Sequence, residues 1–281
     1  GLVGSEMCIR DRFEGLYPDV KRQTSFEQVL ADNEVRGVVV STPAALHYHM
    51  AKQALLAGKD IFVEKPLALT VAEGEELVHL SEKESRVLLV GHLLEYHPAV
   101  VKLKELVDKG ELGKIQYVYS NRLNLGRFRT EENILWSFAP HDISVLLLLL
   151  GEMPKEVSAH GGYYLHSDIA DVTLTTMSFE HGVRAHIFVS WLHPFKEQKF
   201  VIVGDKKMAL FDDGNPEDKL FLYNHQIEWL EGKPIPHPEE ARAIKLPLEE
   251  PLKIECQDFL NCIKTRQKPR VDGNKGLQVL K

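Results

Sequence analysis

Apolar β-branched runs and helical segments alternate between residues 37 and 91, and this alternation restricts the fold more than any other feature of the sequence. Such a strand–helix–strand–helix–strand order is typical of a parallel, doubly wound sheet. Gly58 suits the left-handed end of the first helix, and Thr70 with Glu73 forms a capping box for the second. The expected strands are Gly37–Val40, Asp60–Val63 and Val87–Gly91, and the first of them should be buried. The expected helices between them are Ala45–Ala57 and Thr70–Glu84. A short helix capped by Thr24 or Ser25 is expected before the first strand.

Polar residues follow the first two of these strands directly. Ser41, Thr42 and Pro43 come after the first strand, and Glu64, Lys65 and Pro66 come after the second. The carboxyl ends of parallel strands share one sheet edge, which is where ligands bind in open α/β sheets. A lysine at that edge suits a phosphate contact or proton transfer to an alcohol oxygen. The pattern therefore indicates an enzyme.

The glycine-rich loop G-x-G-x-x-G, which normally opens a dinucleotide-binding fold, does not occur in the sequence. We therefore expect residues 13–97 to form a partial dinucleotide-binding domain that lacks its first strand and this loop. Residues 1–12 have neither helical nor strand periodicity and are expected to be a non-native leader. The last residues, 276–281, are expected to begin a helix that the end of the chain interrupts. On this interpretation the chain as given binds NAD weakly.

From residue 98 onward the pattern changes to an α+β arrangement. Alternating segments separated by turns predict a large, mostly antiparallel and open sheet. Pro140 is expected at the first position of a buried helix that continues to Leu150. The remaining expected elements are helices Pro98–Lys109 and Pro251–Lys264, and strands Ile115–Asn124, Glu156–Tyr164, Asp171–Phe179, Val183–Trp191, Lys199–Val203 and Lys207–Phe211. Residues 98–281 are thus predicted to be a domain for substrate binding and oligomerisation.

Composition argues against several classes of protein. The net charge of −7 disfavours nonspecific binding to nucleic acid, which needs a basic face. The six apolar residues Val145–Leu150 are too few for a membrane span. The three cysteines have no spacing that suggests a disulfide or a metal site, which fits a reducing compartment such as the cytoplasm. A zinc hydrolase is the alternative that thirteen histidines suggest, but none of them forms H-x-x-x-H or H-E-x-x-H, so no metal is expected.

Several short motifs occur in an order that resembles the Gfo/Idh/MocA family of oxidoreductases. They are Ser41-Thr42-Pro43, His47, Ala57-Gly58-Lys59, Glu64-Lys65-Pro66, Tyr96-His97-Pro98 and the expected helix start Pro140-His141-Asp142-Ile143. The resemblance implies an NAD(P)-dependent dehydrogenase of sugars, polyols or nucleotide sugars, with NAD favoured. It also implies a homodimer or homotetramer. Such a protein holds a nicotinamide cofactor in the first domain and a small sugar-like substrate against the sheet of the second.

The resemblance assigns roles to particular residues. It places Ser41, Thr42 and Pro43 on the pyrophosphate and ribose, His47 near the adenine side, and Glu64 on a ribose hydroxyl. It implies that Lys65 stands beside the nicotinamide and the substrate, after a Lys-Pro bond that is often cis. We expect Lys65 and His141 to be the catalytic pair, with His141 as the base and Lys65 orienting the oxygen; the reverse is open. The residue one turn before His141, often Asp in the family, is Ser137 here, which weakens the hold on the imidazole.

The substrate side is expected to include Tyr96, Arg122, Asn124, Trp136 and Asp142. Arg122 and Asn124 alternate on one face of a strand, and arginine suits diphosphate oxygens. The segment 133–143 resembles family members that oxidise UDP-amino sugars, at C3 in the case of UDP-N-acetylglucosamine.

Simpler interpretations of these residues stay open. Ser41 and Thr42 could be a helix cap, His47 a solvated helix residue, Arg122 a solvated edge and Trp136 part of the core. A polyol or inositol dehydrogenase and a non-catalytic binding module remain the alternative functions.

Overall fold

A computed structural model describes residues 16–21, 23–126 and 128–281, and it separates residues 1–36 from residues 37–281 as two compact units. In the first unit, helix α2 (Phe26–Ala31) begins at Ser25, whose hydroxyl accepts a hydrogen bond from the amide of Gln28. The predicted cap is therefore confirmed for Ser25. The predicted leader, residues 1–12, lies outside the described residues.

The second unit begins with a parallel sheet of three strands in the order β1 (Gly37–Val40), β2 (Asp60–Glu64) and β3 (Leu88–Gly91), as predicted. The helices between them are η1 (Ala44–Leu46), α3 (His47–Leu56) and α4 (Val71–Lys83). Both reciprocal hydrogen bonds of the capping box between Thr70 and Glu73 are present. The expectation that β1 is buried is wrong, because β1 is at one edge of this sheet and Val39 is 55% exposed.

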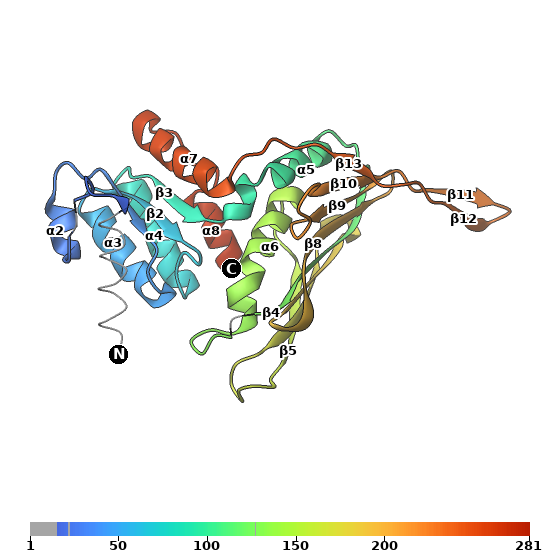
Figure 1. Cartoon of the computed structure of the whole chain (residues 1–281), viewed down its shortest axis with the longest axis horizontal. Helices are drawn as coiled ribbons and strands as arrows, with labels where there is room; N and C mark the ends of the chain where they lie inside the picture. The colour runs from blue at the N-terminus through green and yellow to red at the C-terminus, as the bar shows by residue number, and fades with distance from the viewer. Residues whose placement is uncertain (1–15, 22, 127) are drawn as a thin grey trace. The chain divides into compact units, whose positions relative to one another are not determined.

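Two helices from the end of the chain cover this same parallel sheet (Figure 1). Helix α7 (Pro251–Thr265) places Phe259 against Phe62 and Leu89, and helix α8 (Gly273–Leu280) packs on β3 and α4. Because Leu88 contacts α8 while its neighbour Leu89 contacts α7, the two helices lie on opposite faces of the sheet. The predicted division at residue 97 grouped both helices with the second domain; that division stays a prediction.

An eight-stranded, mostly antiparallel sheet forms the rest of this unit, in the order β13-β10-β9-β8-β4-β7-β6-β5. Only β4 and β7 pair in parallel, so the predicted sheet type is confirmed. The strands are β4 (Ile115–Leu125), β5 (Glu156–Gly162), β6 (Val172–Ser178), β7 (Arg184–Ser190), β8 (Leu192–Gly204), β9 (Met208–Asp212), β10 (Leu220–Tyr223) and β13 (Arg242–Ile244). Strands β11 (Gln226–Leu230) and β12 (Lys233–His237) form a separate hairpin, and η2 (Leu93–Tyr96), α5 (Pro98–Asp108) and η3 (Glu180–Gly182) complete the elements.

Helix α6 (Ile134–Leu150) contacts both halves of this unit. It packs on β4, β6 and β7 of the large sheet, and it also contacts α8 and η2, which belong with the parallel sheet. The prediction that Pro140 starts this helix is wrong. Asn133 caps it instead, because its side chain accepts a hydrogen bond from the amide of Trp136, and Pro140 lies inside the helix.

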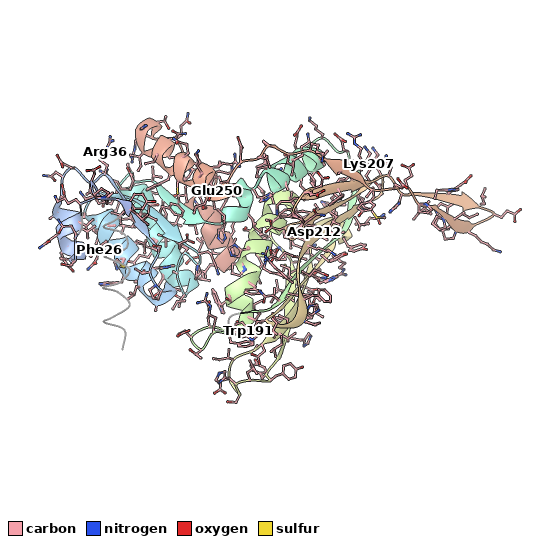
Figure 2. All side chains as sticks on the ribbon, viewed as in Figure 1. Phe26, Arg36, Trp191, Lys207, Asp212 and Glu250 are labelled. Carbon is pink, nitrogen blue, oxygen red and sulfur yellow. The ribbon has the colours of Figure 1, made fainter. Side chains whose placement is uncertain are left out.

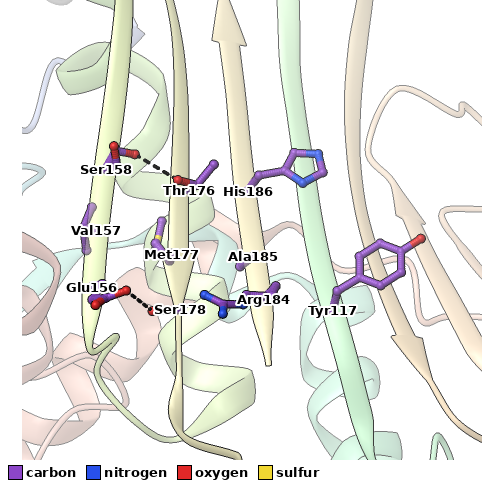
Figure 3. Close-up of a pocket in the computed structure, with 10 residues that line it drawn as sticks. All are labelled: Tyr117, Glu156, Val157, Ser158, Thr176, Met177, Ser178, Arg184, Ala185 and His186. Atoms are coloured by element: carbon purple, nitrogen blue, oxygen red, sulfur yellow. Dashed lines mark hydrogen bonds between the residues drawn. The ribbon is translucent and has the colours of Figure 1, made fainter. Parts of the chain in front are cut away.

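The two faces of the large sheet differ in what covers them. Ala185, Ile187 and Val189 of β7 belong to the core that includes α6, so Arg184 and His186 point to the other face. That outer face has a hollow of about 620 Å³ in which Tyr117, Thr176 and His186 are exposed to view (Figure 3). Trp191, at the end of β7 (Figure 2), is fully enclosed and donates from Nε1 to Asp171 at 2.6 Å.

Among the residues that the structure describes, no helix is both long enough and apolar enough to cross a membrane.

Candidate active site

Lys65 connects the end of β2 to helix α6. Its ammonium donates a hydrogen bond of 2.7 Å to the backbone carbonyl of Ser137, one turn before His141. The Lys65–Pro66 peptide bond is cis, as the resemblance implied. The structure thus brings the predicted catalytic lysine to the helix that carries the predicted catalytic histidine.

Lys65, His141 and a second imidazole, His92, are electrostatically coupled. Burial lowers the pKa of Lys65. Burial, and then the charges of Arg122, Lys65 and His92, hold the pKa of His141 well below its ordinary value. Burial and the Lys65 charge lower the pKa of His92 to about 3. Both imidazoles are therefore neutral near pH 7.

The two imidazoles also share an unpaired atom: the Nδ1 atoms of both His92 and His141 are buried without a hydrogen-bond partner. A buried polar atom left unpaired is costly and often marks a place where a ligand or water completes the site. The sequence interpretation missed His92. Its signal was available, since His92 follows β3 directly at the same sheet edge as Lys65.

Arg122 and Asp142, both predicted to bind substrate, are bonded to each other. Arg122 on β4 donates to Asp142 on α6 from Nε at 2.8 Å and from a terminal nitrogen at 3.1 Å. Their side chains are only 11% and 3% exposed. The alternative that Arg122 is a solvated strand edge is wrong. The pair fastens α6 to the large sheet next to His141. If either residue contacts a substrate, it does so while bonded to the other.

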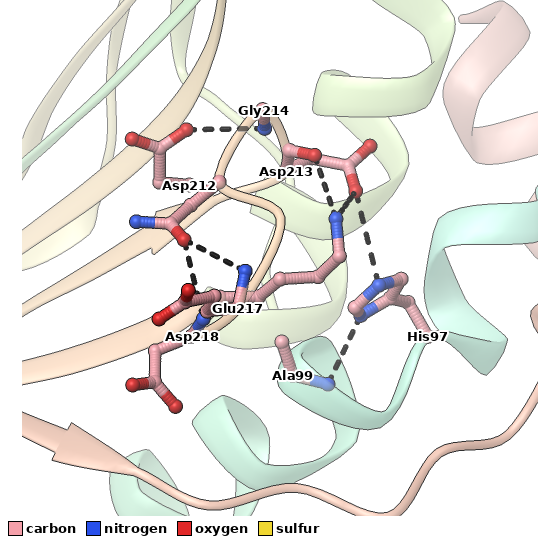
Figure 4. A network of polar contacts seen from close by, with 9 residues as sticks. His97, Ala99, Asp212, Asp213, Gly214, Glu217 and Asp218 are labelled. Carbon is pink, nitrogen blue, oxygen red and sulfur yellow. Dashed lines mark hydrogen bonds and ion pairs between the residues drawn. The ribbon is translucent and has the colours of Figure 1, made fainter.

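Figure 4 shows a polar network around Asp213, whose carboxylate also acts on the guanidinium of Arg122. Asp213 accepts hydrogen bonds from Lys219 and lies 3.8 Å from Nε2 of His97, whose Nδ1 accepts from the amide of Ala99 and so caps α5. The carboxylates of Asp142 and Asp213 raise the pKa of Arg122, against the effect of burial. The two carboxylates therefore offset the burial of the Arg122 charge.

Glu64 ends β2 beside β3, and a carboxyl from α7 lies near it. A methyl group on Gly91 would come within 2.9 Å of the Glu64 carboxylate, so glycine leaves room for this side chain. Glu255 is 1% exposed, and its Oε1 has no partner. Burial, together with Glu64 and then Asp258 and Glu95, raises the pKa of Glu255 to about 8. Glu255 is therefore mostly protonated near pH 7.

The residues after β1 are arranged around His47. Ser41 is exposed, and the Thr42 hydroxyl lies 3.7 Å from the sulfur of Met50. The alternative that Ser41 and Thr42 cap the following helix is wrong, because neither η1 nor α3 has a side-chain cap. His47 is 2% exposed and lies between two backbone carbonyls, so the alternative of a solvated His47 is also wrong. Whether it contacts a cofactor stays a prediction.

A cleft of about 870 Å³ opens beside these loops. Pro43, Ala45 and Pro66 line it from the parallel-sheet side, and Trp136 and Arg129 line it from the other side. Trp136 is half-buried, so it is not part of the closed core. A flat indole beside two loop prolines can accept a planar ring.

The remaining predicted substrate residues lie in different surroundings. Asn124 is half-buried, and its Oδ1 is a further buried atom without a partner. Tyr96 is 1% exposed and donates its hydroxyl to Asp258 on α7, under the guanidinium of Arg270. Its contact with substrate stays a prediction. Within the described part of the chain, no three His, Cys, Asp or Glu side chains are grouped to hold a metal ion.

Comparison with known sequences defines the class of protein. The profile of the oxidoreductase family with an NAD-binding Rossmann fold (GFO_IDH_MocA) matches residues 12–92, and that of the GFO/IDH/MocA C-terminal domain matches residues 100–210. The chain therefore belongs to the Gfo/Idh/MocA family of oxidoreductases, which have an NAD-binding Rossmann fold, and the resemblance found in its motifs is confirmed.

Individual relatives are more distant. The chain is 28% identical to UDP-N-acetylglucosamine 3-dehydrogenase from Acidithiobacillus ferrooxidans over 248 residues, which is 88% of this chain and 76% of that enzyme. The solved structure of that enzyme superposes with a TM-score of 0.80 at 27% identity, covering 92% of this chain and 80% of the other. The scyllo-inositol 2-dehydrogenase of Bacillus subtilis is 27% identical over 207 residues, covering 67% and 60% of the two chains.

Proposed function

We propose that this chain oxidises a secondary hydroxyl of a sugar or nucleotide sugar with NAD(P), and that C3 of a UDP-amino sugar is the favoured position. The observation that carries the proposal is the hydrogen bond from Lys65, at the end of β2, to the turn of α6 that precedes His141. Similarity to the Acidithiobacillus enzyme supports the choice of a UDP-amino sugar.

The residues after β1 and β2 fit a nicotinamide dinucleotide. Ser41, Thr42 and Pro43 would hold its pyrophosphate and ribose, and Glu64 would accept a hydrogen bond from a ribose hydroxyl. The carboxyl edge of the sheet and the cleft lined by Pro43 and Pro66 support this placement. When bound, NAD(P) supplies the acceptor for the substrate hydride. We favour NAD, and calorimetric titration with NAD and NADP tests this preference.

The chain's own residues handle the proton of the substrate hydroxyl. Neutral His141 accepts the proton, since burial first, and then the neighbouring charges, lower its pKa and leave its imidazole uncharged. An ammonium has three donors, and Ser137 takes one from Lys65, so two remain for a substrate oxygen. Lys65 thereby orients this oxygen and stabilises the negative charge that develops on it.

A panel of substrates tests the proposal. The chain is incubated with millimolar NAD, because weak binding is expected, and each of UDP-N-acetylglucosamine, glucose and scyllo-inositol, while NADH is followed by absorbance. Faster NADH formation with the UDP-sugar supports the proposal. A preference for scyllo-inositol would favour the polyol alternative, which similarity to the Bacillus enzyme supports. No NADH with any substrate would favour the non-catalytic alternative.

We also propose that two copies associate through the outer face of the large sheet. Tyr117 and Leu174 are 42% and 40% exposed there, and Tyr117 stacks on Tyr119, which stacks on His186. An apolar face of this kind is costly to leave in water. A dimer or tetramer by light scattering, reduced to a monomer by Leu174→Glu, is the expected result, and a monomeric parent protein would contradict it.

A further inference from the structure

His47 is a buried imidazole whose two ring nitrogens face two different loops. It is the first residue of α3, its ring is 2% exposed, and each of its nitrogens lies at hydrogen-bond distance from a backbone carbonyl. Nδ1 is 2.7 Å from the carbonyl oxygen of Pro66, and Nε2 is 2.8 Å from that of Thr42. Because a carbonyl only accepts, the ring donates to both carbonyls when both of its nitrogens carry a hydrogen, and to one of them when it is neutral.

The two carbonyls belong to the two loops that form the cofactor edge. Thr42 lies in the loop after β1, and Pro66 lies in the turn after β2, as the next residue after Lys65. The ring thus spans the gap between the segments that carry the proposed pyrophosphate contact and the proposed catalytic lysine.

We propose that His47 is a positioning residue that ties the loop after β1 to the turn that carries Lys65. The kinetic consequences of this inference rest on the proposed function. Its structural consequences rest only on the two contacts of the ring. The Pro66 contact fixes the direction from which Lys65 reaches Ser137, 2.7 Å from its ammonium. The Thr42 contact fixes the loop that would hold the cofactor. The two contacts therefore serve different parts of the site.

Two isosteric variants separate the contacts. In His47→Asn the side-chain amide stands where Nδ1 stood and can still donate to Pro66. In His47→Gln the amide stands where Nε2 stood and can still donate to Thr42. His47→Leu removes both donors at similar volume. His49, an exposed residue two positions further on the same helix, provides the matched control as His49→Gln.

The first measurement needs no activity. The backbone carbonyl carbons of Thr42 and Pro66 are followed by NMR in the labelled full chain, since a carbonyl signal reports the loss of its hydrogen bond. We expect His47→Asn to shift the Thr42 signal, His47→Gln to shift the Pro66 signal, His47→Leu to shift both, and His49→Gln to shift neither. The same shift of both signals in Asn and Gln variants would mean that His47 only supports the fold, and would overturn the proposal.

The second measurement separates this inference from the proposed function. At millimolar NAD, His47→Gln is expected to lower kcat by about 10²-fold, because a misplaced Lys65 affects the chemical step. His47→Asn is expected to raise the KM for NAD about tenfold, the effect of one hydrogen bond. Equal effects of both variants on kcat and KM would contradict the proposal. If each variant shifts the carbonyl signal expected for it but the parent chain forms no NADH, the proposed function fails while the positioning role stands.

Discussion

The buried ion pair between Arg122 and Asp142 gives a quantitative test of how α6 is held beside the site. Two hydrogen bonds of 2.8 and 3.1 Å join side chains that are 11% and 3% exposed. Removing one partner leaves the other charge buried without compensation, which costs about 3–5 kcal/mol. We therefore expect Asp142→Leu alone, or Arg122→Met alone, to lower the free energy of unfolding by about that amount.

The double variant Arg122→Met with Asp142→Leu provides the decisive comparison. Replacing both charges by apolar groups of similar size is often neutral, so it should be more stable than either single variant. It also removes the first charge that depresses the pKa of His141, so that pKa should rise. Urea unfolding followed by circular dichroism measures the stabilities, and NMR titration of the His141 ring measures the pKa.

A surface ion pair serves as the control. Lys104 and Asp108 form an i,i+4 pair on α5, and Asp108→Asn should change the free energy of unfolding by less than about 0.5 kcal/mol. Single variants of Arg122 or Asp142 that behave like this control would refute the reasoning. They would show that the pair is hydrated in solution and does not fasten α6.

Three further predictions concern the site. Lys65→Met should leave NAD binding by calorimetry nearly unchanged and reduce turnover by at least ~10²-fold; unchanged turnover would remove Lys65 from the mechanism. Glu255→Gln should stabilise the protein at pH 8, because the pKa of Glu255 is raised to about 8: folding favours its protonated form, so its contribution to stability is full below pH 4.5 and is lost as pH rises toward 8. Unfolding curves between pH 5 and 9 should show a flatter pH dependence in the variant, and an identical dependence would contradict this. Gly91→Ala should raise the KM for NAD, because its methyl group would lie 2.9 Å from the Glu64 carboxylate; a KM equal to that of the parent would argue against Glu64 as a cofactor residue.

Features that depend on neighbours in the sequence could be predicted. The capping box of Thr70 and Glu73, the left-handed Gly58 and the alternation of the first three strands with helices all follow from local patterns, and the structure has them. The start of α6 shows where local signals compete. Pro140 suits a first helical position, but Asn133 provides a side-chain cap seven residues earlier, and the apolar residues between them extend the helix.

Contacts between distant residues could not be predicted in the same way. Arg122 and Asp142 were each recognised as polar residues near the substrate, but nothing in either segment indicates that they bond across 20 positions of the sequence. The same holds for His47, whose partner Pro66 lies 19 positions away on the next strand end. His92 differs, because its position after a buried strand was a sufficient signal and was overlooked.

The central claim is that Lys65 and His141 meet at one substrate hydroxyl. A crystal structure of the chain soaked with NAD and UDP-N-acetylglucosamine tests it most directly. We expect the Lys65 ammonium and a ring nitrogen of His141 both within about 3.2 Å of the same sugar oxygen. A sugar bound in another cavity, or touched by only one of the two residues, would contradict the account.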